Sequence, residues 1–361
     1  MSSLINLQAA ANRIEALQRE DGSIPWIDAG LWDPWNHGES TMALAVAGRT
    51  ESCARALEAL FDRQETDGGW TGELGASVPL DETNRRLVVD HPATARDTNF
   101  TGYASVTVLR SALALNEPGW LDRYAGPVRR AMDFVLSCQT NEGDIVWRKP
   151  DAGEALNDVD SLRAGNACLY KSLECAIRLE TALESDIHVL TEARTRLAVA
   201  LHDKDWRFDR KSTDRRRYAM DWYYPVLSGV HSLEESQRRL EAGWSRYVVE
   251  GLGSRCVADE PWVTAAETAE LALACQAVGW TAKARKLISD LAPLAARSGG
   301  YWMGWQFEEE ILWPYERPAW TSAAVILAAD AIEHLSPGSD LLVTPLKTVS
   351  AAQRGATPQA S

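Results

Sequence analysis

A short turn that ends in tryptophan recurs along the chain and constrains the fold more than any other feature. Its clearest copies are residues 18–26, 64–70 and 139–147. In each copy a glutamine closes a helical stretch, an acidic residue and a glycine turn the chain, and an indole follows. Less complete copies end at Trp206, Trp262 and Trp302. Repetition at this spacing indicates a chain built from repeated structural units.

The two helices that flank each turn differ in composition. The helix before the turn is amphipathic, as in residues 51–64, where the charges share one face. The helix after it is rich in small residues, as in 101–115, whose one charge is Arg110. A helix that is apolar all round must be buried all round, so six such helices should form a ring inside six amphipathic ones. The sequence therefore predicts an all-α (α/α)6 toroid in one domain, residues 1–335, followed by a flexible tail, 336–361.

Composition excludes several classes of partner. The chain of 361 residues has a net charge of -14, whereas nucleic-acid binding needs a basic face. Its start lacks a signal peptide, and no apolar run is long enough to span a bilayer. Six scattered cysteines form no C-x-x-C pair. We expect a cytoplasmic protein with reduced thiols, no cofactor and no stable membrane insertion; the sequence names no partner protein.

The predicted connectivity places all loops from outer to inner helices at one end of the ring. The N-termini of the inner helices gather there, and each carries or follows an acidic residue: Glu39, Asp97, Asp160, Asp221, Glu260 and Glu316. Indoles and carboxylates should therefore surround a central cavity, and such a cavity is the expected site for a small-molecule substrate.

Four acidic residues are candidate catalytic groups: Glu39, Asp97, Asp221 and Glu267. Asp97 and Asp221 begin inner helices two repeats apart, so they should face each other across the mouth. One would have a raised pKa and act as the acid, and the other would stay ionised. Both residues also fit a role as helix N-caps. Glu267 and Glu270 lie in an otherwise small-residue helix, where a charge must face the cavity or be buried at high cost.

Aromatic and basic residues near the same loops are candidates for binding the substrate. His37 could also be a hydrogen-bonded strut in its loop, and the basic loop 207–217 could hold a phosphate. The candidate substrate-binding residues are Trp35, His37, Tyr223, Tyr224, Arg255, Trp262, Trp302, Trp305 and Trp320.

The glutamine-to-tryptophan turns resemble the QW repeats of the terpenoid cyclase and protein prenyltransferase superfamily. Residues 308–330, with Trp-Pro-Tyr-Glu-Arg-Pro-Ala-Trp, resemble a terminal repeat of that kind, and the chain is also similar to small bacterial prenyltransferase-like proteins. The resemblance covers residues 1 to about 335. It implies an enzyme that acts on an isoprenoid in the central cavity by acid-initiated carbocation chemistry, with aromatic faces stabilising the cation.

The chemistry motifs of that superfamily match only in part. The acid of squalene-cyclase-type enzymes lies in Asp-x-Asp-Asp, whereas this chain has Asp158-Val-Asp160-Ser161. The zinc ligands of prenyltransferases are an Asp, a Cys and a His, and no histidine here accompanies an Asp-x-Cys, so no metal is expected.

Two other functions stay open. One is a carbohydrate-active (α/α)6 enzyme, a glycoside hydrolase, lyase or epimerase, that uses paired carboxylates and stacks sugars on indoles. The acidic mouth favours this reading, whereas the turn motif favours the isoprenoid one. The other is a toroid that binds a ligand without catalysis.

Overall fold

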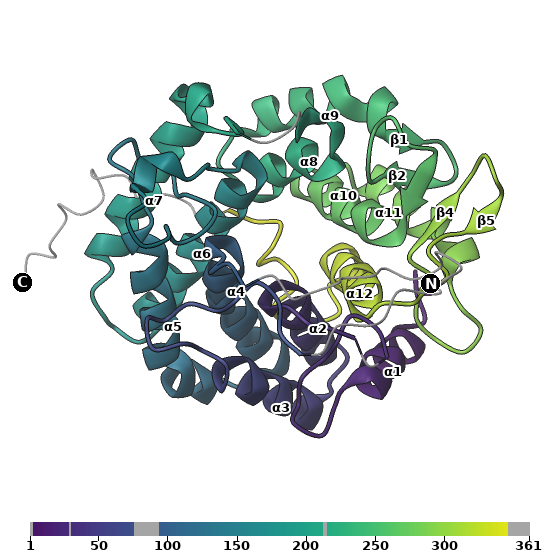
Figure 1. Ribbon diagram of the computed structural model, residues 1–361. Helices are drawn as coiled ribbons and strands as arrows, with labels where there is room; N and C mark the ends of the chain where they lie inside the picture. The colour runs from purple at the N-terminus through teal and green to yellow at the C-terminus, as the bar shows by residue number, and fades with distance from the viewer. Residues whose placement is uncertain (1–2, 29, 76–93, 212–214, 346–361) are drawn as a thin grey trace, which may run out of the picture.

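The computed structural model describes residues 3–28, 30–75, 94–211 and 215–345, and these form two concentric rings of helices (Figure 1). The outer helices are α1 (Leu7–Leu17), α3 (Thr50–Phe61), α5 (Gly119–Ser137), α7 (His188–Asp203), α9 (Leu233–Tyr247) and α11 (Thr281–Asp290). The inner helices are α2 (Pro34–Val46), α4 (Thr98–Leu115), α6 (Arg163–Ala182), α8 (Ala219–Leu227), α10 (Ala265–Ala277) and α12 (Ala319–Glu333). The predicted all-α (α/α)6 toroid is confirmed.

The ring closes through contacts between its first and last repeats. Helix α12 packs against both α1 and α2. The inner helices are buried along almost their whole length, and α12 contributes Ala323, Val325 and Ile326 to the core. Burial on all sides explains why five of these helices carry at most two charges each. Helix α6 carries five, and each of them is in an ion pair.

The recurring glutamine fastens three of the outer helices, α1, α3 and α5, to the next outer helix. The Gln64 side-chain amide donates to Gly68 O at 2.9 Å, within its own turn, and to Pro127 O in α5, also at 2.9 Å. Gln18 makes the same bridge to α3, and Gln139 makes it to α7. The glycine is required because a Cβ at Gly68, whose φ is +90°, would lie 2.1 Å from the Arg130 carbonyl oxygen. The motif is therefore a structural device of the ring.

The tryptophans of these turns do not share one role. Trp70 is fully buried, and its Nε1 donates to Leu60 O at 2.8 Å. Trp26 and Trp147 are partly buried. Trp26 donates to Asp33, and Trp147 lines the central cavity described below.

Replacing Trp70 by alanine should lower the free energy of unfolding by about 3–5 kcal/mol, because the change leaves a large cavity in a core that cannot collapse. Urea unfolding of the variant and the wild type measures the loss. A cost below about 1 kcal/mol would contradict the buried position of the indole.

A small antiparallel sheet was not expected from the sequence. Its strands are β1 (Val248–Val249), β2 (Gly253–Arg255), β3 (Trp262–Thr264), β4 (Gly304–Gln306) and β5 (Ile311–Leu312), paired in that order. They belong to the loops before α10 and α12, which lie side by side, and β4 and β5 project beyond α12 in Figure 1. Strands this short carry no alternating pattern long enough to detect.

The chain continues in contact with the ring beyond the domain end predicted at residue 335. Ser336, Ser339 and Leu341 are buried. Arg110 of α4 donates to Gly338 O, and Arg178 of α6 donates to Thr344 O. These contacts lie near the C-terminal ends of the inner helices, so residues 336–345 cover the end of the ring opposite the cavity. The remainder of the predicted tail, 346–361, lies outside the described residues.

Within the described ranges, no helix is both long enough and apolar enough to cross a membrane.

Candidate active site

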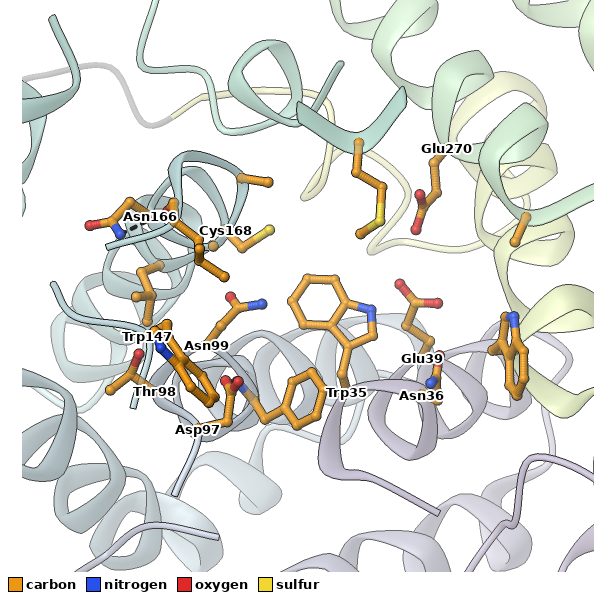
Figure 2. Close-up of a pocket in the computed structure, with 18 of the residues that line it drawn as sticks. Trp35, Asn36, Glu39, Asp97, Thr98, Asn99, Trp147, Asn166, Cys168 and Glu270 are labelled. Atoms are coloured by element: carbon orange, nitrogen blue, oxygen red, sulfur yellow. Dashed lines mark hydrogen bonds between the residues drawn. The ribbon is translucent and has the colours of Figure 1, made fainter. Parts of the chain in front are cut away.

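The N-terminal turns of the inner helices surround a cavity of about 420 Å³ (Figure 2). Trp35, Trp147 and Trp320 supply aromatic walls, and Glu39 and Asp97 are among its carboxylates. The remaining residues that line the cavity are Asn36, Thr98, Asn99, Phe100, Leu162, Ala164, Gly165, Asn166, Cys168, Leu169, Arg215, Met220, Ala266, Glu267 and Glu270. The cavity lies at the end of the ring where the sequence placed it.

Two carboxylates from different helices face each other in this cavity. Figure 2 shows Glu39 of α2 and Glu270 of α10 pointing toward one another. Burial raises the pKa of Glu39 well above its ordinary value, and the neighbouring carboxylate of Glu270 raises it further. The hydroxyl of Tyr103 lies 3.4 Å from Glu39 Oε1, at the long end of hydrogen bonding. Glu39 therefore holds its proton more tightly than an ordinary carboxylic acid.

Glu270 is held by two phenols. Tyr224 donates its hydroxyl to Oε1 at 2.7 Å, and Tyr223 donates to Oε2. Burial raises the pKa of Glu270 to about 7, with the charge of Glu267 as a second cause, whereas the two phenols lower it. Because donors favour the charged form, Glu270 loses its proton before Glu39 does.

Glu267 lies one helical turn before Glu270 in α10, and its partly buried side chain lines the cavity. The Thr264 hydroxyl donates to Glu267 Oε2, which orients the carboxylate.

Asp97 lines the same cavity and also caps its helix. Its Oδ1 accepts from Phe100 N at 2.8 Å, at the start of α4. Burial raises the pKa of Asp97 to about 7, although the backbone donors of Phe100 and Asn99 oppose the shift. Asp97 therefore caps its helix and lines the cavity, and its role as an acid stays a prediction.

Asp221 is buried in the first turn of α8 and is not among the residues that line the cavity. Its Oδ2 lies 3.4 Å from Arg215 Nε, and the guanidinium of Arg215 does reach the cavity wall. Burial raises the pKa of Asp221 to about 6, and Arg215 opposes that shift. The structure thus places an arginine where the sequence-based expectation placed a second carboxylate opposite Asp97.

Of the expected substrate-binding residues, Trp35 and Trp320 line the cavity. Tyr224 lies beneath it, in a smaller apolar chamber of about 50 Å³ that shares Trp35, Glu39 and Glu270 with the cavity. Tyr223 is fully buried behind Glu270.

The structure does not bring the other expected binding residues to this cavity. His37 is fully buried; its Nδ1 accepts from Ile24 N at 3.1 Å and its Nε2 lies 2.8 Å from Ala56 O, so it is a strut. Burial lowers the pKa of His37 to about 4, so it stays neutral. Arg255 donates to Ala258 O and Glu260 O in its own loop. Trp262, Trp302 and Trp305 belong to the sheet and its neighbouring loop.

Three cavity residues were not singled out from the sequence. Asn99 lies two positions after Asp97, and its Oδ1 is buried without a hydrogen-bond partner among the described residues. Trp147 was read only as the indole of a turn. Arg215 belongs to the basic loop, but no local pattern distinguishes it from its neighbours. Among the described residues, no group of three or more His, Cys, Asp and Glu could hold a metal ion.

Comparisons with known proteins identify the family. The chain is 34% identical over 331 residues to the MMP endo-(1,4)-3-O-methyl-alpha-D-mannosidase of Mycolicibacterium hassiacum, which covers 92% of this chain and 87% of that protein. The chain therefore belongs to the family of this glycosidase. No family model matches the sequence.

Two solved structures of glycosidases share this architecture. A wild-type glycosidase superposes with a TM-score of 0.65 at 13% identity, covering 91% of this chain and 96% of that one. The GH63 mannosylglycerate hydrolase of Thermus thermophilus, in complex with glucose, gives 0.62 at 13% identity, with 90% and 99% covered. At this identity the likeness shows the fold alone.

The resemblance to terpenoid cyclases and prenyltransferases is therefore wrong as a guide to family and function. The family is one of glycosidases, and both groups share only the toroid. The physical reason is that the Gln-Gly-Trp turn fastens neighbouring outer helices, a task that any α/α ring must perform whatever its substrate.

Proposed function

We propose that this protein is a glycoside hydrolase that cleaves internal bonds of a (1,4)-linked 3-O-methyl-α-D-mannoside. The observation that carries the proposal is the 34% identity to an enzyme of that activity across 92% of the chain. The cavity supports it, because indoles that stack on sugar rings and carboxylates that transfer protons occur there together.

Glu39 is the proton donor in this proposal. A glycosidic oxygen must be protonated as its bond to the anomeric carbon breaks, and the donor must keep its proton near neutral pH. Burial and the facing Glu270 raise the pKa of Glu39 well above its ordinary value, whereas the pKa values of Glu270 and Asp97 are raised to about 7. Glu270 acts through Glu39, since its charge, held by Tyr223 and Tyr224, favours the protonated form of its neighbour.

Glu267 is the base. Its Oε2 is oriented by Thr264, and its partly buried side chain lines the cavity, where a water molecule could contact it. Glu267 takes a proton from the attacking water, whose oxygen bonds to the anomeric carbon. The glycosidic bond breaks at the same carbon, and its electron pair takes the proton of Glu39. One water is consumed and two sugar chains leave.

Polar and aromatic walls would orient the sugar. The ring faces of Trp35, Trp147 and Trp320 have a negative electrostatic potential, which attracts the C–H groups of a pyranose. The buried Oδ1 of Asn99 lacks a partner among the described residues and is suited to accept from a sugar hydroxyl.

The purified protein should cut oligosaccharides of (1,4)-linked 3-O-methyl-α-mannose internally. Mass spectrometry should show a ladder of shorter chains, each product pair heavier than the substrate by one water, and the Glu39→Gln variant should form them at least about 100-fold more slowly. Unmethylated chains of equal length provide the matched control for the methyl group. Products without the added water would indicate a lyase, and an unchanged mass with altered stereochemistry would indicate an epimerase. An intact substrate would overturn the proposal.

A further inference from the structure

A second hollow, of about 230 Å³, lies beside the central cavity and has an aromatic wall of its own. Trp302 and Tyr315 stack there with ring centroids 4.3 Å apart and planes 30° from parallel. Tyr315 is 55% exposed, which is high for an aromatic side chain. The wall is also firmly held, because the Arg317 guanidinium lies 5.3 Å from the Trp302 ring and donates to Ser298 Oγ and Gly299 O.

A charged pair forms the opposite side of the hollow. The Nη2 atom of Arg13, in α1, lies 3.3 Å from Asp28 Oδ2. The Nε atom of Arg13 donates to Arg317 O at 3.1 Å. Arg13 is mostly buried, whereas the Asp28 side chain is 78% exposed. The hollow thus combines an exposed aromatic face with a fixed carboxylate acceptor, which is the combination that binds a sugar ring and its hydroxyls.

The backbone joins this hollow to the central cavity. Ile27 and Asp28 line it from the loop before α2, and Arg317 lines it from the loop before α12. Trp320, three residues after Arg317, lines the central cavity and meets Trp26 edge to face at 5.9 Å. The loops before α2 and α12 thus line this hollow, and the helices that follow them line the central cavity.

We propose that the hollow between Tyr315 and Asp28 is a remote subsite that binds a sugar unit of the same glycan chain cleaved in the central cavity. The inference rests on the proposed function, because an enzyme that cuts within a chain must hold sugar units on both sides of the scissile bond. The occupant is a neutral pyranose, stacked on Tyr315 and hydrogen-bonded to Asp28.

The test compares chain lengths. Tyr315→Ala should raise KM for long 3-O-methyl-α-mannose oligosaccharides about five- to tenfold, the loss expected for one stacked ring. It should leave kcat/KM unchanged for the shortest chain that the wild type cleaves. Tyr315→Phe retains the ring and should behave as wild type. Trp206→Ala, which removes an aromatic side chain that is 62% exposed and contacts neither hollow, is the matched control and should show no dependence on chain length.

The outcomes separate the two proposals. If the wild type cleaves the glycan but Tyr315→Ala processes long and short chains as the wild type does, the subsite is refuted while the activity stands. A wild type that cleaves no chain refutes the activity and, with it, the subsite. A loss of kcat/KM for Tyr315→Ala that is equal at all chain lengths would show that the residue acts on folding or on the central cavity, and would also refute the subsite.

Discussion

Replacing Glu39 by glutamine is expected to lower kcat on a methylated mannoside about 10²- to 10⁴-fold, the usual contribution of a positioned acid or base. The substitution keeps the shape of the side chain. It removes the carboxylic acid proton of Glu39, a group whose pKa is raised by burial and by Glu270. Glu267→Gln should cause a loss of similar size, because water would then lack a base. Steady-state kinetics on one oligosaccharide measures both.

The matched controls are Asp97→Asn and Asp221→Asn, which preserve shape and capping. Asp97 and Asp221 were the acid and base favoured by the sequence, and their catalytic role stays a prediction. If Glu39→Gln keeps wild-type turnover while Asp97→Asn loses it, then Asp97, whose pKa burial raises to about 7, is the acid. Unfolding curves for each variant show whether a loss of activity comes from the missing carboxylic acid or from a loss of folded protein.

The pH profile distinguishes Glu270 from the two groups that touch substrate. Activity requires Glu39 protonated, so it is lost as pH rises through the raised pKa of Glu39. The charge of Glu270 is one cause of that rise. Glu270→Gln removes the charge, so the pKa of Glu39 should fall and the alkaline loss of activity should move to lower pH. An unmoved alkaline limb would show that Glu270 does not act on Glu39.

The fold could be read from the sequence because its signals are local. Gln64, Gly68 and Trp70 lie within one turn, and each has a single task in that turn. The small and apolar residues that dominate most inner helices likewise follow from burial, although α6 carries five charged residues. Chemistry did not follow from the same residues, because they contact helices and not substrate.

The cavity was predictable in position and less so in detail. Topology alone placed the inner N-termini together, which brought Glu39, Asp97 and Glu267 to one site. Side-chain direction decided the rest. Asp221 is not among the residues that line the cavity and pairs with Arg215, which does line it, and Tyr223 and Tyr224 donate hydrogen bonds to Glu270. The spacing of residues along one helix does not show which of its side chains will contact a side chain from another repeat.

A buried ion pair at the end of the ring opposite the cavity also joins residues whose pairing the sequence does not reveal, and it bears on stability. The sequence marked Arg110 as the one charge in its helix, and Asp330 lies 220 positions away. Both are fully buried, with Arg110 Nη2 donating to Asp330 Oδ2 at 2.6 Å. Asp330 also accepts from Ser336 N at 2.7 Å and from Ser336 Oγ at 2.8 Å. This network joins α4, α12 and the segment 336–345.

Replacing Asp330 by alanine should therefore lower the free energy of unfolding by about 5 kcal/mol, because it leaves a buried guanidinium without its counter-charge and orphans both groups of Ser336. Urea unfolding measures the change. Glu58→Ala, which breaks the exposed pair with Arg123, is the matched control and should cost less than about 1 kcal/mol. Pairing Asp330→Leu with Arg110→Met should recover at least about 2 kcal/mol of the loss, since removing both charges leaves no unpaired ion. A double variant as unstable as the single one would show that the cost lies in the connection to Ser336 and not in the buried charge.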